Sequence, residues 1–165
     1  MATEADWEAY RTAVVDLDPP GTPGLRLVPD EAGAVGAWPA GLAAPVFVVT
    51  AWNPDSVVLD EAENRARHDR LVAELDRRGV AHWPAVGRDT VVVGGAQPMA
   101  PAHHEEGVGM TGITRDEALA LGRAHGQAAI YAWSPEAWEV VSCTDDRRHV
   151  AGWRLERRGG TGSPG

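Results

Sequence analysis

The sequence has no lysine, so all 15 of its basic residues are arginine. Without lysine the chain cannot form a Schiff base through a lysine amine, bind pyridoxal phosphate covalently, or place a lysine in a Walker A phosphate-binding loop. Alanine, glycine, arginine and valine are abundant, which is typical of GC-rich coding sequence. That bias accounts for the missing lysine without a functional cause.

Cysteine and long apolar runs are also scarce. The single cysteine, Cys143, excludes an internal disulfide framework. The longest apolar stretch, residues 43–52, is interrupted by Pro45, and its length of about ten residues is half of what a membrane helix needs. The first residues carry neither the positive start nor the apolar segment of a signal peptide. We therefore expect a cytoplasmic protein without a membrane segment.

Positive charge is in deficit, since the formal net charge is −9. Nucleic-acid binding requires a basic surface that releases phosphate counterions, so we do not expect a nucleic-acid partner. The charge is uneven, because residues 147–165 carry five arginines and one glutamate. We interpret this segment as a final strand followed by a solvated tail.

The length of 165 residues and the apolar fraction of 44% are sufficient for one domain with a hydrophobic core. We predict a single α+β domain over residues 1–158 and a disordered tail over 159–165. Two helices are indicated by capping-box patterns, one over 61–78 after Asp60 and one from Thr114 to His125.

Strand patterns fill most of the remaining chain. The continuous apolar run at 45–52 predicts a central strand buried on both faces. The other predicted strands cover residues 10–17, 25–28, 80–86, 90–93, 106–111, 127–133, 138–143 and 150–157, with a loop over 94–102. This order predicts a two-layer sandwich, with two main helices packed on a mostly antiparallel sheet of about five to seven strands.

The end of the central strand is the best candidate for a site. The strand delivers three side chains to the sheet edge, namely Thr50, Trp52 and Asn53. A strand end beside a helix start is a common ligand position, and the free N–H groups of a helix start favour an anion. On the following helix, three polar side chains share one face, namely Asn64, Arg67 and His68. Alternatively, Asn53 forms an Asx turn before Pro54 and Asn64 satisfies loop backbone groups.

Five segments in order carry a resemblance to a known family: Thr50-Ala51-Trp52-Asn53-Pro54, Glu63-Asn64-Arg65, Glu105-Glu106, Gly112-Ile113-Thr114 and Gly126-Gln127-Ala128. Over residues 8–143 the chain resembles the bacterial family known as domain of unknown function 3293. The resemblance implies a small cytoplasmic bacterial protein of no established activity. It also implies one shared site made of Thr50, Asn53, Asn64, one of the two glutamates and Gln127. The chain departs from the family pattern in its extra sequence at 94–102 and in glycines at 107 and 109, where the family has bulkier residues.

Metal and nucleophile chemistry have weaker signals. His103 and His104 precede two glutamates, but adjacent residues of an extended chain point to opposite faces. We therefore predict an exposed loop, with no metal and no cofactor. Cys143 has no basic neighbour or helix start to lower its pKa, so we expect an inert buried thiol. His125 lies in the last turn of a helix, where the helix dipole favours an imidazolium.

These observations predict one polar pocket, built from Thr50, Trp52, Asn53, Asn64, Glu106 and Gln127. Amide groups donate and accept hydrogen bonds, so the pocket suits a small polar or anionic metabolite, and Arg67 would pair with a carboxylate or phosphate on it. If the protein is an enzyme, Glu106 or His68 is the acid–base group. The alternative is a non-catalytic protein-interaction module that uses the sheet edge and the Arg-rich C-terminal segment. The sequence leaves the oligomeric state open.

Overall fold

The structure is a computed structural model that describes residues 2–88 and 104–158. Its elements are α1 (Glu4–Thr12), β1 (Val14–Leu17), β2 (Leu25–Asp30), β3 (Val46–Thr50), the short 3-10 helix η1 (Pro54–Ser56), α2 (Glu61–Arg78), β4 (Ala81–Arg88), β5 (His104–Thr111), α3 (Arg115–Ala124), β6 (Ala129–Trp133), β7 (Trp138–Ser142) and β8 (Arg148–Arg157). The predicted strand at 90–93, loop at 94–102 and tail at 159–165 lie outside the described residues.

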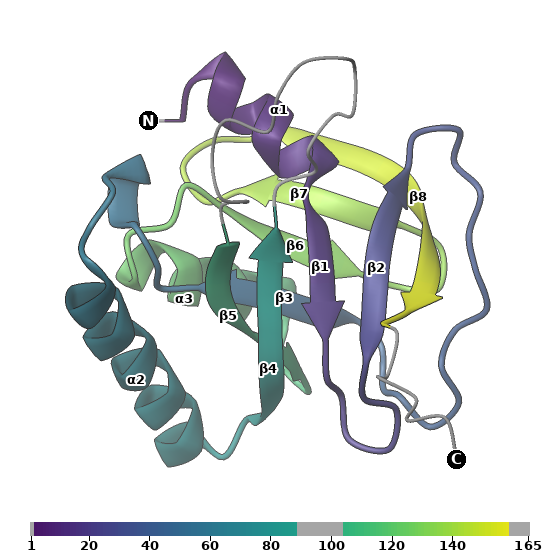
Figure 1. The fold of residues 1–165 in the computed structure, drawn as a ribbon, viewed down its shortest axis with the longest axis horizontal. Coiled ribbons are helices and arrows are strands. Elements are labelled where there is room, and N and C mark those ends of the chain that lie inside the picture. The colour runs from purple at the N-terminus through teal and green to yellow at the C-terminus, as the bar shows by residue number, and fades with distance from the viewer. Residues whose placement is uncertain (1, 89–103, 159–165) are drawn as a thin grey trace, which may run out of the picture.

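The eight strands form a closed antiparallel barrel in the order β1-β2-β8-β7-β6-β3-β5-β4 (Figure 1). The prediction of a two-layer sandwich is therefore wrong. The barrel closes because β1 pairs on both sides, with Val15 opposite Leu27 of β2 and opposite Gly87 of β4. Local sequence patterns show which segments are extended, but they carry no signal for a pairing between segments so far apart in the chain.

The N-terminal segment also differs from the expected strand over residues 10–17. It forms α1 up to Thr12, and only Val14–Leu17 is a strand. Thr3 caps the helix in a reciprocal capping box: its Oγ1 accepts from the Asp6 N–H at 3.2 Å, and the Asp6 carboxylate accepts from the Thr3 N–H at 2.7 Å. In Figure 1, α1 lies across the end of the barrel where β1 begins.

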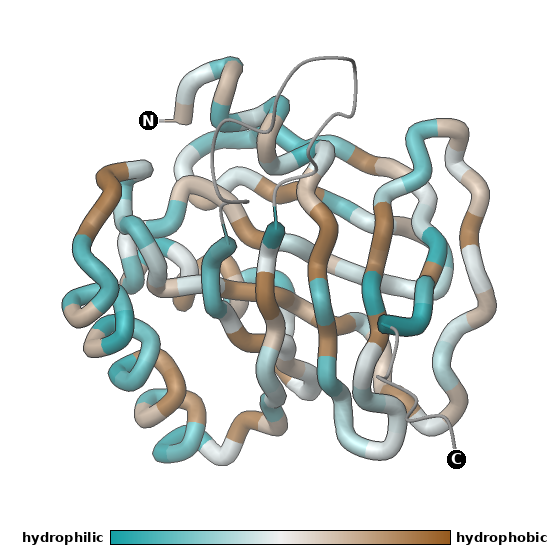
Figure 2. Tube along the Cα trace, viewed as in Figure 1, coloured by the Kyte–Doolittle hydropathy of each residue, from teal (hydrophilic) through white to brown (hydrophobic). Residues whose placement is uncertain are grey.

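Strand alternation produces two hydrophobic cores. On β3, Val46 and Val48 point into the barrel, where the core is rich in tryptophan, while Phe47 and Val49 point outward. β3 is therefore buried on both faces, as its continuous apolar run predicts. The outer core is covered by α2 and α3, and Figure 2 shows hydrophobic residues concentrated on the strands and hydrophilic residues prominent along α2.

The two predicted helices are confirmed. The Asp60 side chain accepts from the Glu63 N–H at 2.8 Å at the start of α2, and Gly79 ends that helix with a left-handed φ of 65°. Thr114 and Glu117 form the capping box of α3. No helix within residues 2–88 and 104–158 has the length and apolar character needed to span a membrane.

Candidate functional site

A cavity of about 240 Å³ lies between α1 and the inside of the barrel. Its floor includes Val15 and Val48, which belong to the barrel core. Its rim is polar and comes from elements at the mouth of the barrel, with side chains from α1, the segment after β3, the start of β5 and the segment before β6: Asp6, Tyr10, Asn53, Asp55, Ser56, Glu105 and Gln127. The cavity thus joins an apolar floor to a polar rim.

The segment after β3 has an unusual backbone. Asn53, Asp55 and Ser56 have φ values of 45°, 55° and 59°, and all three line the cavity. Positive φ is uncommon outside glycine and is most tolerated by asparagine and aspartate. Such conformations persist only when their surroundings hold them, and they cluster at functional sites.

Asn64 of α2 holds this segment in place. Its Oδ1 accepts from the Asn53 N–H at 2.8 Å, and its Nδ2 donates to Asn53 Oδ1 at 2.8 Å and to the Leu59 carbonyl at 3.3 Å. Asn64 is 2% exposed and does not line the cavity. It therefore positions Asn53 from behind, which is the backbone-satisfying role that the sequence left open as an alternative.

Gly126 and Gln127 connect the end of α3 to the same segment. The Asp55 N–H donates to the Gly126 carbonyl at 2.8 Å, and a Cβ at Gly126 would lie 2.6 Å from the Cβ of Pro54. Gln127 Nε2 donates to the Trp52 carbonyl at 3.0 Å. The close approach requires glycine, and it places the Gln127 side chain at the cavity.

The last part of the site is the pairing of β3 with β5. Thr50 Oγ1 donates to the Glu106 carbonyl at 2.8 Å and accepts from the Trp52 N–H at 3.0 Å, while Asn53 Nδ2 donates to Glu105 Oε1 at 3.3 Å. Gly107 lies opposite Thr50, and a Cβ there would be 2.9 Å from the Val49 carbonyl oxygen. This close approach disfavours a bulkier residue at 107.

The other unusual glycine, Gly109, makes room for a core side chain. A Cβ at this position would lie 2.5 Å from Nε1 of Trp83. The indole of Trp83 therefore packs directly over the backbone of β5 inside the barrel. A large barrel-core residue on β4 compensates for the small residue on β5.

Glu106 points to the opposite face of β5 from Glu105 and does not line the cavity. Arg65 of α2 binds its carboxylate through two nitrogens, with an Nη2–Oε1 distance of 2.9 Å. This interaction lowers the pKa of Glu106. The Arg65 guanidinium also lies 5.7 Å from the ring centroid of Trp52. Glu106 and Trp52 thus belong to an α2 contact outside the barrel.

His68 and Arg67 also lie away from the cavity. Burial lowers the pKa of His68, so this side chain is neutral at physiological pH. Arg67 lies 3.7 Å from Glu63 and lines a separate hollow between α2 and the end of α3. His125, at that hollow, lies 3.0 Å from Glu74 and links the two helices. The structure therefore does not bring the predicted acid–base and anion-binding residues to the cavity.

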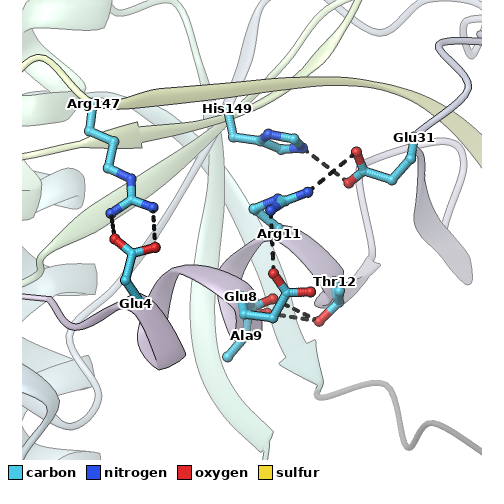
Figure 3. Close-up of polar contacts among 8 residues, drawn as sticks. All are labelled: Glu4, Glu8, Ala9, Arg11, Thr12, Glu31, Arg147 and His149. Atoms are coloured by element: carbon cyan, nitrogen blue, oxygen red, sulfur yellow. Dashed lines mark hydrogen bonds and ion pairs between the residues drawn. The ribbon is translucent and has the colours of Figure 1, made fainter.

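Ion pairs to the barrel hold α1 in place over the cavity (Figure 3). Arg147 binds the Glu4 carboxylate at 2.5 and 2.9 Å, and its guanidinium lies 4.4 Å from the ring centroid of Trp7. Arg11 lies 3.8 Å from Glu31, which also contacts His149 at 3.0 Å. These contacts fix the helix that contributes Asp6 and Tyr10 to the rim.

The remaining candidates from the sequence are the thiol of Cys143 and a metal site. Cys143 is 2% exposed, and burial raises its pKa to about 11, so the thiol is protonated at physiological pH. No group of three or more His, Cys, Asp or Glu side chains within 2–88 and 104–158 is arranged to hold a metal ion. His103 lies outside the described residues.

Comparison with protein families matches the central part of the chain to a known family. The family described as "Protein of unknown function (DUF3293)" matches residues 49–130. Over this range the chain belongs to the DUF3293 family. No curated protein and no solved structure matches the chain.

The DUF3293 region supplies most of the polar rim, from Asn53 through Glu105 to Gln127. Asp6 and Tyr10 come from outside it. Sequence reasoning missed both, together with Asp55 and Ser56. The capping pattern of Thr3 and Asp6 was the available signal for α1, since a threonine followed three positions later by an acidic residue is a helix-start signature.

Proposed function

We propose that this protein acts in the bacterial cytoplasm by binding a small polar metabolite in the cavity beneath α1. The observation that carries the proposal is the convergence of the Asn53–Ser56 backbone, Glu105 and Gln127 on one cavity. These side chains come from three separate segments of the sequence, and hydrogen bonds and close backbone contacts hold them in place.

The size of the cavity supports a small ligand. Its volume of about 240 Å³ lies just below the range of roughly 300–1,000 Å³ typical of pockets for drug-sized molecules. Asn53 Oδ1 already accepts from Asn64 Nδ2 and the Leu59 N–H, and Gln127 Nε2 already donates to the Trp52 and His125 carbonyls. The second Nδ2 hydrogen of Asn53 and the Oε1 of Gln127 supply one donor and one acceptor, which suit hydroxyl, amine or carbonyl groups. The apolar floor favours a ligand with a hydrocarbon portion.

The backbone of residues 53–56 also supports binding. Glycine would adopt these positive φ values without steric cost. The chain instead has Asn53, Asp55 and Ser56 there, at a cost of order 1–3 kcal/mol for each strained residue. This strained backbone places three polar side chains at the cavity. In our proposal, their contacts with the ligand offset the conformational cost.

Filling the cavity tests the proposal. Gly87 lines it, and a Cβ at this position meets only the Glu105 carbonyl oxygen at 4.0 Å. Gly87→Val therefore adds a side chain in open space on a strand. Wild type and variant are screened by thermal shift against single amino acids, amines, sugars, nucleosides and short carboxylic acids.

We expect at least one compound to stabilise wild type, by roughly 2.7 kcal/mol at 100 times its Kd, and not Gly87→Val. Ala81→Val, at the exposed far end of the same strand, is the control and should bind normally. A flat screen with folded wild type, or an equal shift in Gly87→Val, contradicts the proposal.

The protein-interaction alternative has less support. Each of the eight described strands pairs with two neighbours, so β8 offers no open edge for strand addition. Several C-terminal arginines pair with acidic residues of the same chain, as Arg147 does with Glu4 and Arg158 does with Asp18.

A further inference from the structure

We propose that the ligand carries a positively charged amino group, which binds among the carboxylates of Asp6, Asp55 and Glu105 at the rim of the cavity. This inference rests on the proposed function and specifies its ligand class. It replaces the expectation of an anionic ligand, because Arg67, the residue expected to bind an anion, lies at a different surface.

The charges that line the cavity are mostly negative. Among the lining residues within 2–88 and 104–158, three carboxylates accompany one cation, Arg88, whose Nε donates to Asp16 at 2.8 Å. Arg88 is therefore already engaged with an acid on the outer side of β1. Asp6 accepts from the Thr3 N–H, and Glu105 accepts from Asn53 Nδ2. The net charge of the lining favours a cation.

Tyr10, which lines the cavity, is affected by the negative potential of these carboxylates. Burial is the main reason that its pKa is raised; a hydrogen bond with Ser56 acts to lower it, and the charges of Asp6 and Glu105 act to raise it by smaller amounts. The phenol thus stays protonated and neutral beside the carboxylates. The same negative potential would stabilise an ammonium group placed near Tyr10.

Aromatic side chains also line the cavity. Tyr10 and Tyr131 both line the cavity, and Tyr131 is stacked on Trp138 with ring centroids 4.8 Å apart and planes inclined by 15°. An ammonium near an aromatic face is attracted by the ring quadrupole. Carboxylates and tyrosine rings together form the combination that distinguishes an amine from an alcohol of equal size.

The apolar floor indicates where the rest of the ligand lies. Val15 and Val48 come from the barrel interior, whereas Asp6, Asp55 and Glu105 come from elements at its mouth. A ligand with a short aliphatic or aromatic body and one terminal ammonium group satisfies both parts. The inferred class is therefore a small primary amine with an apolar body.

The test uses probes that differ only in the terminal group. One set is tyramine, tyrosol and 4-hydroxyphenylacetate, and the other is hexylamine, hexanol and hexanoate. Affinities are measured by equilibrium dialysis on wild type, Glu105→Gln and Asp55→Asn. Glutamine at 105 retains an oxygen acceptor for Asn53, and asparagine tolerates the positive φ of residue 55. Glu156→Gln removes an exposed carboxylate of β8 and controls for net charge.

We expect wild type to bind the amine of at least one set about tenfold more tightly than the alcohol, with the carboxylate weakest. Glu105→Gln and Asp55→Asn should each reduce that preference several-fold while binding the alcohol as before, and Glu156→Gln should not reduce it. An alcohol or carboxylate that binds as tightly as its amine overturns the inference and leaves the proposed function standing. Absence of amine binding at millimolar concentration also overturns it. The proposed function fails separately, if Gly87→Val binds every probe and metabolite as wild type does.

Discussion

The two faces of β3 and β5 have opposite characters. On the outer face, Phe47, Val49, Val108 and Met110 lie in an apolar core beneath α2 and α3. On the inner face, the ends of the same strands carry the polar wall of a cavity, which includes Glu105. One pair of strands therefore contributes to the hydrophobic core on one side and lines the proposed binding cavity on the other. Neighbouring residues can therefore have unrelated roles.

The largest expected effect is on the outer face. Leu71 of α2 is fully buried against this core. We expect Leu71→Ala to lower the free energy of unfolding by about 2–5 kcal/mol, because it removes buried methyl groups and leaves a cavity. Urea denaturation measures the loss. The folded variant should retain wild-type ligand affinity. If affinity falls by more than the unfolded fraction explains, the outer core also supports binding and the two faces are not independent.

Asn64 connects the two faces, so its replacement should affect both. Asn64→Ala leaves the buried Asn53 N–H without its acceptor, and we expect a loss of about 1–3 kcal/mol in unfolding free energy. Ligand affinity should fall as well, because Asn53 loses its support. Asn64→Asp keeps an acceptor for the Asn53 N–H and is the matched comparison. Unchanged stability in Asn64→Ala would show that the strained segment does not depend on α2.

Asp16 shows a third kind of surface, the outward side of β1. Its carboxylate is 2% exposed and accepts from Arg26 at 2.8 and 3.1 Å and from Arg88 at 2.8 Å. Burial acts to raise the pKa of Asp16, but the hydrogen bonds from both arginines outweigh it, so the pKa lies below the ordinary 3.8. Its stabilising contribution is therefore complete above the ordinary value and is lost as the pH falls below it.

We expect Asp16→Asn to cost about 1–3 kcal/mol near neutral pH, because two arginines lose a charged acceptor. The difference between wild type and Asp16→Asn in urea midpoint should shrink as the pH is lowered through about 4. A difference that stays constant down to about pH 3 would mean that the carboxylate charge is not what stabilises this surface.

The smallest expected effect on stability is that of Glu106→Gln, which can be compared with the same change at the adjacent Glu105. Glu106→Gln weakens the ion pair with Arg65, whose partners are 28% and 46% exposed in their side chains, so the loss should be under about 1 kcal/mol. Ligand affinity should not change, in contrast to Glu105→Gln. Parallel dialysis of the two variants checks this. If Glu106→Gln alone loses binding, the binding site lies on the α2 face of β5 instead.

The sequence contained enough local signal to predict the two main helices and β3. Asp60, Thr114 and Gly79 mark helix ends through contacts within a few residues, and the apolar run of β3 reports burial on both sides. Barrel closure has no such local signature. α1 was missed because the apolar residues around position 14 favoured a strand extending back to Tyr10.

The sequence predicted the position of the candidate site more reliably than it predicted which residues line it. Thr50, Asn53 and Gln127 were expected, and all three line the cavity. Glu106 was chosen from the sequence, but choosing Glu105 instead required knowing which face of β5 turns inward. That depends on register with β3, which a single sequence does not contain.

Barrel closure also determines when the chain can complete its fold. β2 pairs with β8 over six residue pairs, from Leu25 opposite Arg157 to Asp30 opposite Gly152. Contacts between such distant segments carry a large loop-closure entropy and slow folding. During synthesis, β2 therefore has β1 as its only pairing partner among the described strands until β8 emerges from the ribosome. The nascent protein therefore exposes the edge of β2 until the last strand arrives.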